Sequence, residues 1–502
     1  MKFILNQPIP TILLTGLLLL GANSRAATNY VDLNNLTPSA PYTNWSTAAT
    51  RIQDAIDAAV AGNLILVNDG VYQTGGRAVF GTMTNRVAVA KPLTLLSVNG
   101  PVVTTIMGYQ VPVTTNGPAA IRCVYLTNGA VLSGFTLTNG ATQSSGDVVH
   151  LQCGGGIWCE SNTAIISNCV VIGNSSFLSG GGVVRGALNN CLLRGNSASL
   201  DGGGSLFSTL TNCILTGNSV KDGGGGGAYG ASPSGGTLIN CIMTGNSAKY
   251  GGGAYQCTLV NCTLTGNSAS SNGGGSFGNP FTYIVSLNNS IIYDNTAPTN
   301  ANFDPTVSMY YCCTTPLPPR GTGSFTNAPQ FIDPAVGDFH LQTASPCINS
   351  GHNYPSQSAT DLDGNPRLRG DTVDPGAYEF QNPTSTISYA WLQQYGLPTD
   401  GSADLADSDN DGMNDSQEWR AGTDPTNAAS VLKLFTPTLT TPHVILTWSS
   451  VTNRSYFVQR TTNLSAASPF SVLKASIPGQ SGTTSYTDTN APGPVYYRVG
   501  VQ

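Results

Sequence analysis

Short runs of apolar residues alternate with turns rich in glycine and asparagine along most of the chain, and these runs recur at a regular interval. The clearest marker is the pair Asn-Cys, whose successive copies are separated by 22, 22, 28 and 21 residues. The five pairs begin at Asn168, Asn190, Asn212, Asn240 and Asn261. A further asparagine and a run of glycines follow each pair, and a weaker copy begins at Asn289. Such a period is the signature of a solenoid whose units stack on one another.

Each unit contains strand-like pieces such as residues 213–216, with no helix-period run between them. Glycine and asparagine, which tolerate positive φ, separate the pieces. The strands must therefore coil directly from one turn to the next. Each turn of about 22 residues then rises by one strand spacing, about 4.8 Å. The predicted fold class is all-β, a right-handed parallel β-helix solenoid.

Equivalent residues of successive turns stack in such a coil, which predicts a column of cysteines inside it. The column contains Cys169, Cys191, Cys213, Cys241 and Cys262. Parallel side chains are poorly aimed for a disulfide, and the close C-x-x-C spacing of metal sites is missing here. We therefore interpret these cysteines as small buried apolar residues. The sequence leaves pairing open for Cys153, Cys159, Cys257, Cys312, Cys313 and Cys347.

An amphipathic helix is predicted before the first turns, over residues 49–60. Ile52, Ile56 and Val60 are four residues apart and form one apolar stripe, which Gly62 ends. An open stack of strands exposes its end, so we expect this helix to cap the amino end of the core. The first strand is predicted at residues 64–67.

The amino terminus has the pattern of a signal peptide, over residues 1–27. Lys2 precedes an apolar run from Ile12 to Leu20, and small residues follow around Ala26. The run is shorter than a spanning helix needs. We therefore expect a secreted, extracellular or outer-surface protein without a transmembrane segment in its mature chain.

The last part of the chain, residues 431–502, has short strand-like runs separated by turn residues. The runs cover residues 431–435, 443–448, 455–459, 470–473, 484–486 and 495–499. This pattern predicts a small β-sandwich.

Charged residues are scarce, and the net negative charge comes from one segment. Charged residues make up 9% of the chain, against about 25% in a typical protein. So sparse a charged surface argues against nucleic-acid binding through phosphates. Residues 400–424 contain eight acids and one base, whereas the whole chain has a net charge of −6. The acidity is therefore a local feature.

The acidic segment contains a calcium-loop pattern, D-x-D-x-D-G-x₅-E, from Asp407 to Glu418. Carboxylates at alternate positions converge on one cation, and Gly412 permits the sharp turn between them. The predicted Ca²⁺ ligands are Asp407, Asp409, Asp411, the Met413 carbonyl, Asp415 and Glu418. Short helices are expected on both sides, at residues 391–395 and 418–420.

Several segments resemble known families. The runs 52–56, 67–72, 91–95 and 134–140 resemble the bacterial pectin-lyase-like β-helix proteins, and the Gly-Asn-Ser-Ala and Gly-Gly-Gly units resemble the repeats of polymorphic outer-membrane proteins. Residues 345–351, 361–367 and 373–379 resemble the choice-of-anchor Q segment of bacterial surface proteins. The calcium loop resembles a thrombospondin type 3 or dockerin-like repeat, and the tail resembles fibronectin type III modules.

These patterns predict four parts of the chain. They are a signal peptide (1–27), a β-helix with its cap and terminal segment (28–382), a calcium-binding module (383–430) and a β-sandwich (431–502).

An aromatic column is the candidate ligand-binding feature of the β-helix. Trp158, Tyr229, Tyr255 and Phe277 occupy equivalent positions after the glycine runs. If the column faces outward it offers a surface for sugars; if it faces inward it is core packing, which is the commoner fate of such residues. The sequence leaves both open, and core packing is favoured.

No catalytic residue is assigned. The active-site strings of pectate lyases and polygalacturonases are missing from the sequence, and Arg185, Arg194 and Lys221 occupy different repeat positions. The favoured hypothesis is a non-catalytic protein that binds an extracellular polysaccharide or cell-surface component. The alternative is a polysaccharide lyase or glycoside hydrolase with an unfamiliar site.

Overall fold

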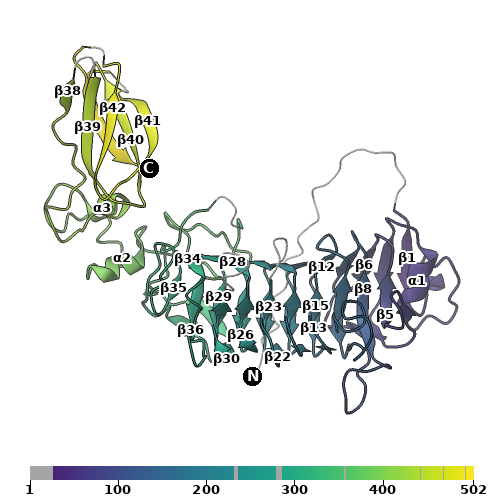
Figure 1. Cartoon of the computed structure of the whole chain (residues 1–502). Helices are drawn as coiled ribbons and strands as arrows, with labels where there is room; N and C mark the ends of the chain where they lie inside the picture. The colour runs from purple at the N-terminus through teal and green to yellow at the C-terminus, as the bar shows by residue number, and fades with distance from the viewer. Residues whose placement is uncertain are drawn as a thin grey trace.

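The structure is a computed structural model that describes residues 26–230, 236–278, 285–354, 358–440, 443–466, 469–491 and 493–502. The predicted signal peptide lies outside these residues except for its last two positions. A long parallel β-helix forms the body of the molecule, and a small β-sandwich lies beyond its carboxyl end (Figure 1). Among the described residues, no helix combines the length and apolar character needed to cross a bilayer.

Two long parallel sheets form two sides of the coil. In spatial order, the first sheet contains β1 (Thr28–Val31), β2 (Leu64–Val67), β6 (Thr94–Ser97), β9 (Val131–Ser133), β12 (Ile165–Ser167), β16 (Ala187–Asn189), β20 (Thr209–Thr211), β24 (Thr237–Ile239), β28 (Thr258–Val260), β32 (Ser286–Asn288) and β34 (Ser308–Tyr310). The second sheet contains β3 (Gly70–Tyr72), β7 (Thr104–Met107), β10 (Thr136–Thr138), β13 (Val170–Ile172), β17 (Leu192–Arg194), β21 (Ile214–Thr216), β25 (Ile242–Thr244), β29 (Thr263–Thr265), β33 (Ile291–Tyr293) and β35 (Cys313–Thr314).

Two further sheets complete the turns. The third sheet contains β4 (Arg77–Ala78), β5 (Thr84–Val89), β8 (Ile121–Leu126), β11 (Ile157–Cys159), β15 (Val183–Val184), β19 (Ser205–Leu206), β23 (Ala228–Tyr229), β27 (Ala254–Tyr255) and β31 (Ser276–Phe277). The fourth contains β14 (Ser175–Ser176), β18 (Ser197–Ala198), β22 (Ser219–Val220), β26 (Ser247–Tyr250) and β30 (Ser268–Asn272). All neighbours are parallel except β4 and β5.

The pairing register confirms the predicted repeat. Ala187 pairs with Thr209, Thr209 with Thr237, and Thr237 with Thr258, which are the expected steps of 22, 28 and 21 residues. The longer step therefore adds residues to a connection between strands and leaves the strand register unchanged.

The predicted cysteine column is also confirmed. Cys169, Cys191, Cys213, Cys241 and Cys262 are at most 3% exposed and belong to the central hydrophobic cluster. Register places Phe135 before them and Ser290 and Cys312 after them, so the column extends in both directions. All twelve cysteines are described, and none forms a disulfide.

A buried asparagine ladder runs beside this column. The Nδ2 of each member donates to the Oδ1 of the next, over 2.9–3.1 Å. Its members are Asn174, Asn196, Asn218, Asn246, Asn267, Asn295 and Asn302. Gly140 N–H donates to the first Oδ1, and the last Nδ2 donates to the Thr315 carbonyl, so both ends are satisfied.

The amino-terminal cap is shorter than the sequence predicts, and the first strand comes earlier. A 3-10 helix, η1 (Trp45–Thr47), precedes α1 (Ile52–Ala58), which buries Ile52 and Ile56 in the core cluster. Val60 lies beyond the end of α1 and is 66% exposed, so the predicted stripe stops at Ile56. The strand β1, which precedes the cap, was not predicted because its four residues carry too short an alternation.

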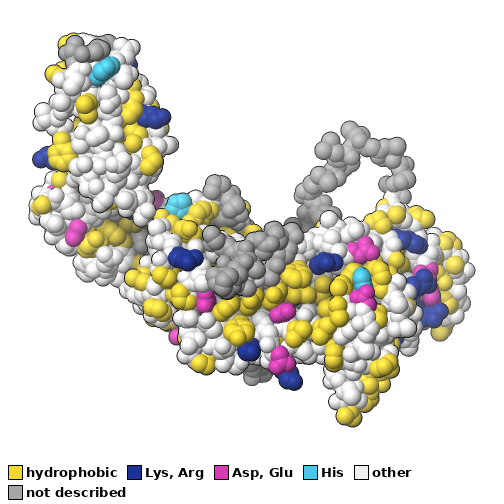
Figure 2. Space-filling view, in the orientation of Figure 1, with side chains coloured by type: hydrophobic (Ala, Val, Ile, Leu, Met, Phe, Trp, Pro, Cys, Tyr) yellow, Lys and Arg dark blue, Asp and Glu magenta, His cyan; other side chains and the backbone are white. Residues whose placement is uncertain are grey.

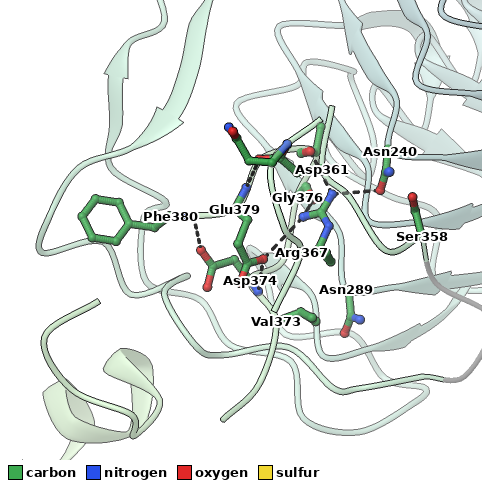
Figure 3. A network of polar contacts seen from close by, with 12 residues as sticks. Asn240, Asn289, Ser358, Asp361, Arg367, Val373, Asp374, Gly376, Glu379 and Phe380 are labelled. Carbon is green, nitrogen blue, oxygen red and sulfur yellow. Dashed lines mark hydrogen bonds and ion pairs between the residues drawn. The ribbon is translucent and has the colours of Figure 1, made fainter. Parts of the chain in front are cut away.

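The terminal segment begins with the hairpin of β36 (Phe331–Asp333) and β37 (Asp338–Leu341), and residues 358–380 then pack against the last turns of the β-helix. Arg367, 2% exposed, fixes this segment (Figure 3). Its Nη2 donates to Asn240 Oδ1 (2.8 Å) and to the Ala377 carbonyl (2.9 Å), and its Nη1 lies 3.6 Å from Glu379 Oε2. The β-helix and its terminal segment therefore share a buried polar network.

The hydrophobic cluster under this segment continues past residue 382. Cys313, Phe339 and Cys347 pack in one cluster with Ile387 and with Leu392 of α2 (Tyr389–Gln394). The predicted boundary between residues 382 and 383 therefore falls inside a packed core.

The carboxyl-terminal part is a β-sandwich, as predicted. One sheet contains β38 (Thr438–Thr440), β39 (His443–Ser450) and β42 (Gly482–Asp488), and the other contains β41 (Ser471–Pro478), β40 (Ser455–Thr461) and β43 (Tyr496–Val501). Trp448 and Tyr456 lie in the core between them. The strand predicted at residues 431–435 is wrong: only a single bridge, Leu434 to Trp448, forms there, and β38 comes later.

Candidate functional site

Three aspartates of the predicted calcium loop converge in the structure. Asp407, Asp409 and Asp411 each place a carboxylate oxygen within 4.8 Å of the other two. Backbone N–H groups fold the loop around them: Asp411 N–H donates to Asp407 Oδ1 (3.1 Å) and Gly412 N–H to Asp407 Oδ2 (3.0 Å). Gly412 has φ of 99°, which a residue with a side chain rarely adopts. The conformation of the turn therefore brings the three negatively charged carboxylates close together.

Glu418 approaches this group from α3 (Asp415–Ala421) and is fully buried. Its Oε1 accepts from Thr423 Oγ1 (3.2 Å), but its buried Oε2 has no hydrogen-bond partner among the described residues. Asp409 Oδ2 and Asp411 Oδ2 are buried and unpartnered as well. Burial, and then the charge of Asp409, raise the pKa of Glu418 to about 7. A divalent cation would supply what these oxygens lack.

Asp415, predicted to offer calcium a direct or water-bridged oxygen, also has contacts within the loop. It is fully buried at the start of α3, where Ser408 N–H donates to its Oδ1 (3.3 Å) and Ser408 Oγ to its Oδ2 (2.9 Å). Asn414 and Gln417 form a capping box at this helix end. Asp415 therefore holds the two ends of the loop together.

Helix α3 also connects the neighbouring parts of the chain. The Arg420 side chain forms an ion pair with Asp371 of the terminal segment. From the β-sandwich, Arg454 Nε donates to the Arg420 carbonyl (2.8 Å) and Arg454 Nη2 to the Trp419 carbonyl (3.0 Å). Helix α3 therefore contacts both the terminal segment and the β-sandwich.

The aromatic column lies on the outer face of the third sheet. Ala228 and Ala254 point into the central cluster, so the next residues on their strands, Tyr229 and Tyr255, point away from it. Figure 2 shows hydrophobic side chains gathered along the β-helix near β15 and β23. The favoured expectation of core packing is therefore wrong for the half-buried residues Tyr229, Tyr255 and Phe277, which we call the aromatic ridge.

The rings of the aromatic ridge stack on one another. Tyr229 and Tyr255 have centroids 4.7 Å apart and planes 2° apart, and Tyr255 and Phe277 have centroids 5.2 Å apart and planes 16° apart. Each turn contributes one ring, and at the strand spacing each ring covers the faces of the rings on the neighbouring turns. The faces of the stacked rings are therefore covered by one another, and a flat platform of ring faces is not formed.

Trp158 belongs to the same column but is covered. It is 2% exposed, because Phe80 and His150 pack on it at centroid distances of 5.5 and 5.1 Å. Its Nε1 donates to the Val149 carbonyl (3.2 Å). This covering loop was not predicted, since nothing in the repeat marks it, and it removes Trp158 from the accessible surface.

The charged residues of the same face are engaged with the protein. Arg185 Nη1 donates to the Glu160 carbonyl (3.0 Å), and its guanidinium carbon lies 6.0 Å from the Trp158 ring. Tyr125 donates a hydrogen bond to the Glu160 carboxylate, which lowers the pKa of Glu160. Lys221 lies 3.9 Å from Asp222 in an exposed pair. Arg185 and Lys221 thus contact different residues, in agreement with their different repeat positions.

Three solved structures illustrate what the chain is similar to. Pectate lyase Pel9A is 14% identical with a TM-score of 0.45, over 70% of this chain and 96% of that one. A rhamnogalacturonan lyase is 12% identical with a TM-score of 0.33, over 74% and 100%. Rice weevil pectin methyl esterase is 13% identical with a TM-score of 0.29, over 61% and 85%.

The sequence has no significant match among curated proteins. One family model matches: residues 407–428 are similar to the bacterial TSP3 repeat, which confirms that resemblance and includes every predicted calcium ligand.

Proposed function

We propose that this chain is a secreted or cell-surface protein whose β-helix binds an extracellular polysaccharide without transforming it. The observation that carries the proposal is the aromatic ridge, a row of half-buried rings that points away from the core. Aromatic side chains are enriched where proteins bind partners, because they offer large apolar area with few rotatable bonds.

The ridge suggests how a glycan would be held. The edges of Tyr229, Tyr255 and Phe277 offer a narrow apolar strip along the helix axis. Tyr250 packs beside Phe277 (5.4 Å between centroids), and the ammonium of Lys249 lies 5.4 Å from the Tyr250 ring. An extended chain with alternating apolar and hydroxyl surfaces fits such a strip better than a compact ligand does.

A glycan array probed with the whole chain tests this proposal. Tyr255→Ala removes the middle ring and is expected to weaken binding of any positive glycan by more than tenfold, as for a central interface residue. Tyr496→Ala is the matched control, since Tyr496 is 50% exposed in the β-sandwich. Binding that is equal in the two variants, or no bound glycan at all, would refute the proposal.

We further propose that Ca²⁺ binds the loop and stiffens the junction beyond the β-helix. Asp407, Asp409, Asp411 and Glu418 would supply carboxylate oxygens and Met413 its backbone carbonyl, while Asp415 positions the loop through Ser408. The support is the set of three buried carboxylate oxygens that have no protein partner. When bound, the cation neutralises this acidic cluster and ties α3 to the turn before it.

The terminal segment and tail fit the same proposal. Residues 345–379 resemble the choice-of-anchor Q segment, and residues 431–502 resemble fibronectin type III modules. We propose that these parts mount the β-helix on a surface or space it from one.

A polysaccharide lyase or glycoside hydrolase is the second candidate, and Asp201 favours it. This carboxyl is partly buried near Tyr229, and burial raises its pKa, as suits a proton donor. Incubation with acidic polysaccharides, followed by ultraviolet absorbance of unsaturated products and by reducing ends, tests for turnover. Turnover that is lost in Asp201→Asn or Arg185→Ala would replace the binding proposal with this one.

A further inference from the structure

A cavity of about 220 Å³ lies at the amino end of the β-helix, between α1 and the beginning of the third sheet. Three arginines line it, Arg51, Arg77 and Arg86, together with the hydroxyls of Thr50 and Thr74. Basic and acidic side chains gather at this end of the molecule, around α1 and β5 (Figure 2). The calcium loop lies at the opposite end (Figure 1).

Arg86 is the unusual member of this lining. It is only 7% exposed, and it donates from Nε to the Met107 carbonyl (2.8 Å) and from Nη1 to the Gly75 carbonyl. Within the described part of the chain, its Nη2 has neither a hydrogen bond nor an ion pair. Burial lowers the pKa of this guanidinium, and no carboxylate offsets the effect. A buried cation without a counter-ion is costly.

The acids of the cavity are already paired with its other arginines. Asp54 Oδ2 lies 2.9 Å from Arg51 Nε, and Asp57 Oδ2 lies 2.5 Å from Arg77 Nη2. Three guanidinium groups and two carboxylates leave the lining one positive charge in excess. The excess is on Arg86, which lines the cavity.

A second buried arginine shows what a purely structural role looks like in this fold. Arg122 is 1% exposed, and every nitrogen has a partner: Nε donates to the Gly154 carbonyl, Nη1 to Asn85 Oδ1, and Nη2 to the carbonyls of His150 and Cys153. Arg86 lacks this full set and borders open space, so packing alone does not account for its position.

We propose that this cavity binds a small, polar carboxylate of the sugar-acid class, with the carboxylate on Arg86. A guanidinium holds a carboxylate through two parallel hydrogen bonds, and Thr50 and Thr74 provide hydroxyls for the polar remainder of the ligand. The volume of about 220 Å³ equals the space of about seven waters at ~30 Å³ each. It therefore has room for one monosaccharide unit.

Isothermal titration calorimetry of the whole chain tests this assignment. The probes are D-galacturonate and D-glucuronate, with D-galactose as the neutral counterpart and inorganic phosphate as a second anion. At least one uronate is expected to bind saturably and to weaken as salt is added, and galactose is expected to bind at least tenfold more weakly. No saturable binding of either uronate, or equal or tighter binding of galactose or phosphate, would overturn the proposal.

Two variants locate the site. Arg86→Lys keeps the charge but loses the paired donors, so uronate affinity should fall about tenfold or more. Thr74→Glu adds a carboxylate at an exposed lining residue and leaves the bonds of Arg86 intact, so it should abolish binding even if Arg86→Lys folds poorly. Thr322→Glu, an exposed threonine near the other end of the β-helix, is the control. Unchanged affinity in Thr74→Glu would show that the uronate binds elsewhere and would overturn the assignment.

Discussion

Asn218 donates a hydrogen bond from Nδ2 to Oδ1 of Asn246, 2.9 Å away on the next turn of the β-helix. The same Oδ1 accepts from the Asn218 backbone N–H (3.0 Å), and the second Nδ2 hydrogen goes to the Leu193 carbonyl (2.9 Å). Since Asn218 is fully buried, each of these bonds joins neighbouring turns away from water.

Replacing this side chain should therefore be severe. Asn218→Ala removes the bond to the Leu193 carbonyl and leaves two N–H groups of Asn196 without their acceptor, which should cost about 3 kcal/mol or more. Urea denaturation followed by circular dichroism measures the loss. Asn99→Ala, an exposed asparagine bonded to Asp69, should change stability by less than about 0.5 kcal/mol. Equal effects in the two variants would contradict a structural role for the ladder.

The asparagine ladder illustrates which features of the fold can be predicted from the sequence. A fixed repeat determines which residues stack, so the strand register and the cysteine column follow once the coil is recognised. The direction that a column faces depends on strand phase and stays open, as it did for Tyr255. Contacts between distant segments leave no periodic pattern in the sequence, as for Arg367, which bonds to Asn240 across 127 residues. The cavity beside Arg86 is likewise formed by several segments, so no local pattern marks this arginine.

The calcium loop was predictable because its ligands are local. Its pattern fixes residue type at alternate positions within twelve residues, so no tertiary information is needed to bring Asp407, Asp409 and Asp411 together. The hydrogen bonds that Ser408 donates to Asp415 were less predictable, since the loop pattern does not specify the residue at position 408.

Removal of calcium should loosen this loop and its junction. Chelation leaves the carboxylates of Asp409, Asp411 and Glu418 close together without a counter-charge, so α3 should separate from the turn. Limited proteolysis is expected to cut near residue 407 within a chelator-treated sample at least tenfold faster than with Ca²⁺ present. The β-helix itself should remain resistant, because its core does not include the loop.

Single substitutions refine this prediction. Glu418→Gln removes the ligand charge from a buried position and should weaken Ca²⁺ binding by tenfold or more in a calorimetric titration. Asp400→Asn, at an exposed acid just before the loop, should bind Ca²⁺ as the unmodified chain does. Calcium affinity that is unchanged in Glu418→Gln would exclude this residue as a ligand.

Glu379 should be a neutral acid at physiological pH. Burial first, and then the charge of Asp374, raise its pKa to about 10. A raised pKa means that its contribution to stability is complete below about pH 4.5 and is lost as the pH rises through about 10. Glu379→Gln mimics the neutral acid, so its stability relative to the unmodified chain should grow with pH and exceed it by more than about 1 kcal/mol at pH 8.

Thermal unfolding at a series of pH values checks this expectation. Asp333→Asn, an exposed acid in the same terminal segment, serves as the control and should show no growing advantage. A Glu379→Gln variant that is less stable than the unmodified chain at every pH would mean that the carboxylate is ionised and paired with Arg367.

His340 should make the terminal segment sensitive to alkaline pH. Its Nε2 lies 2.8 Å from Asp363 Oδ2, its Nδ1 lies 2.6 Å from Asp338 Oδ1, and its ring stacks on Tyr378 at 3.8 Å. These bonds, the one to Asp363 first, raise its pKa to about 9 from the ordinary 6.5. The stabilisation is therefore complete below about pH 6.5 and disappears as the pH rises through about 9.

His340→Gln should lower the melting temperature at pH 6 and have little effect at pH 10, whereas His443→Gln, in the β-sandwich, should show no such trend. Because the ring is 40% exposed, water screens the ion pairs, and the change in melting temperature should be a few degrees at most. A loss of melting temperature that is the same from pH 6 to pH 10 would mean that His340 contributes by packing on Tyr378 alone.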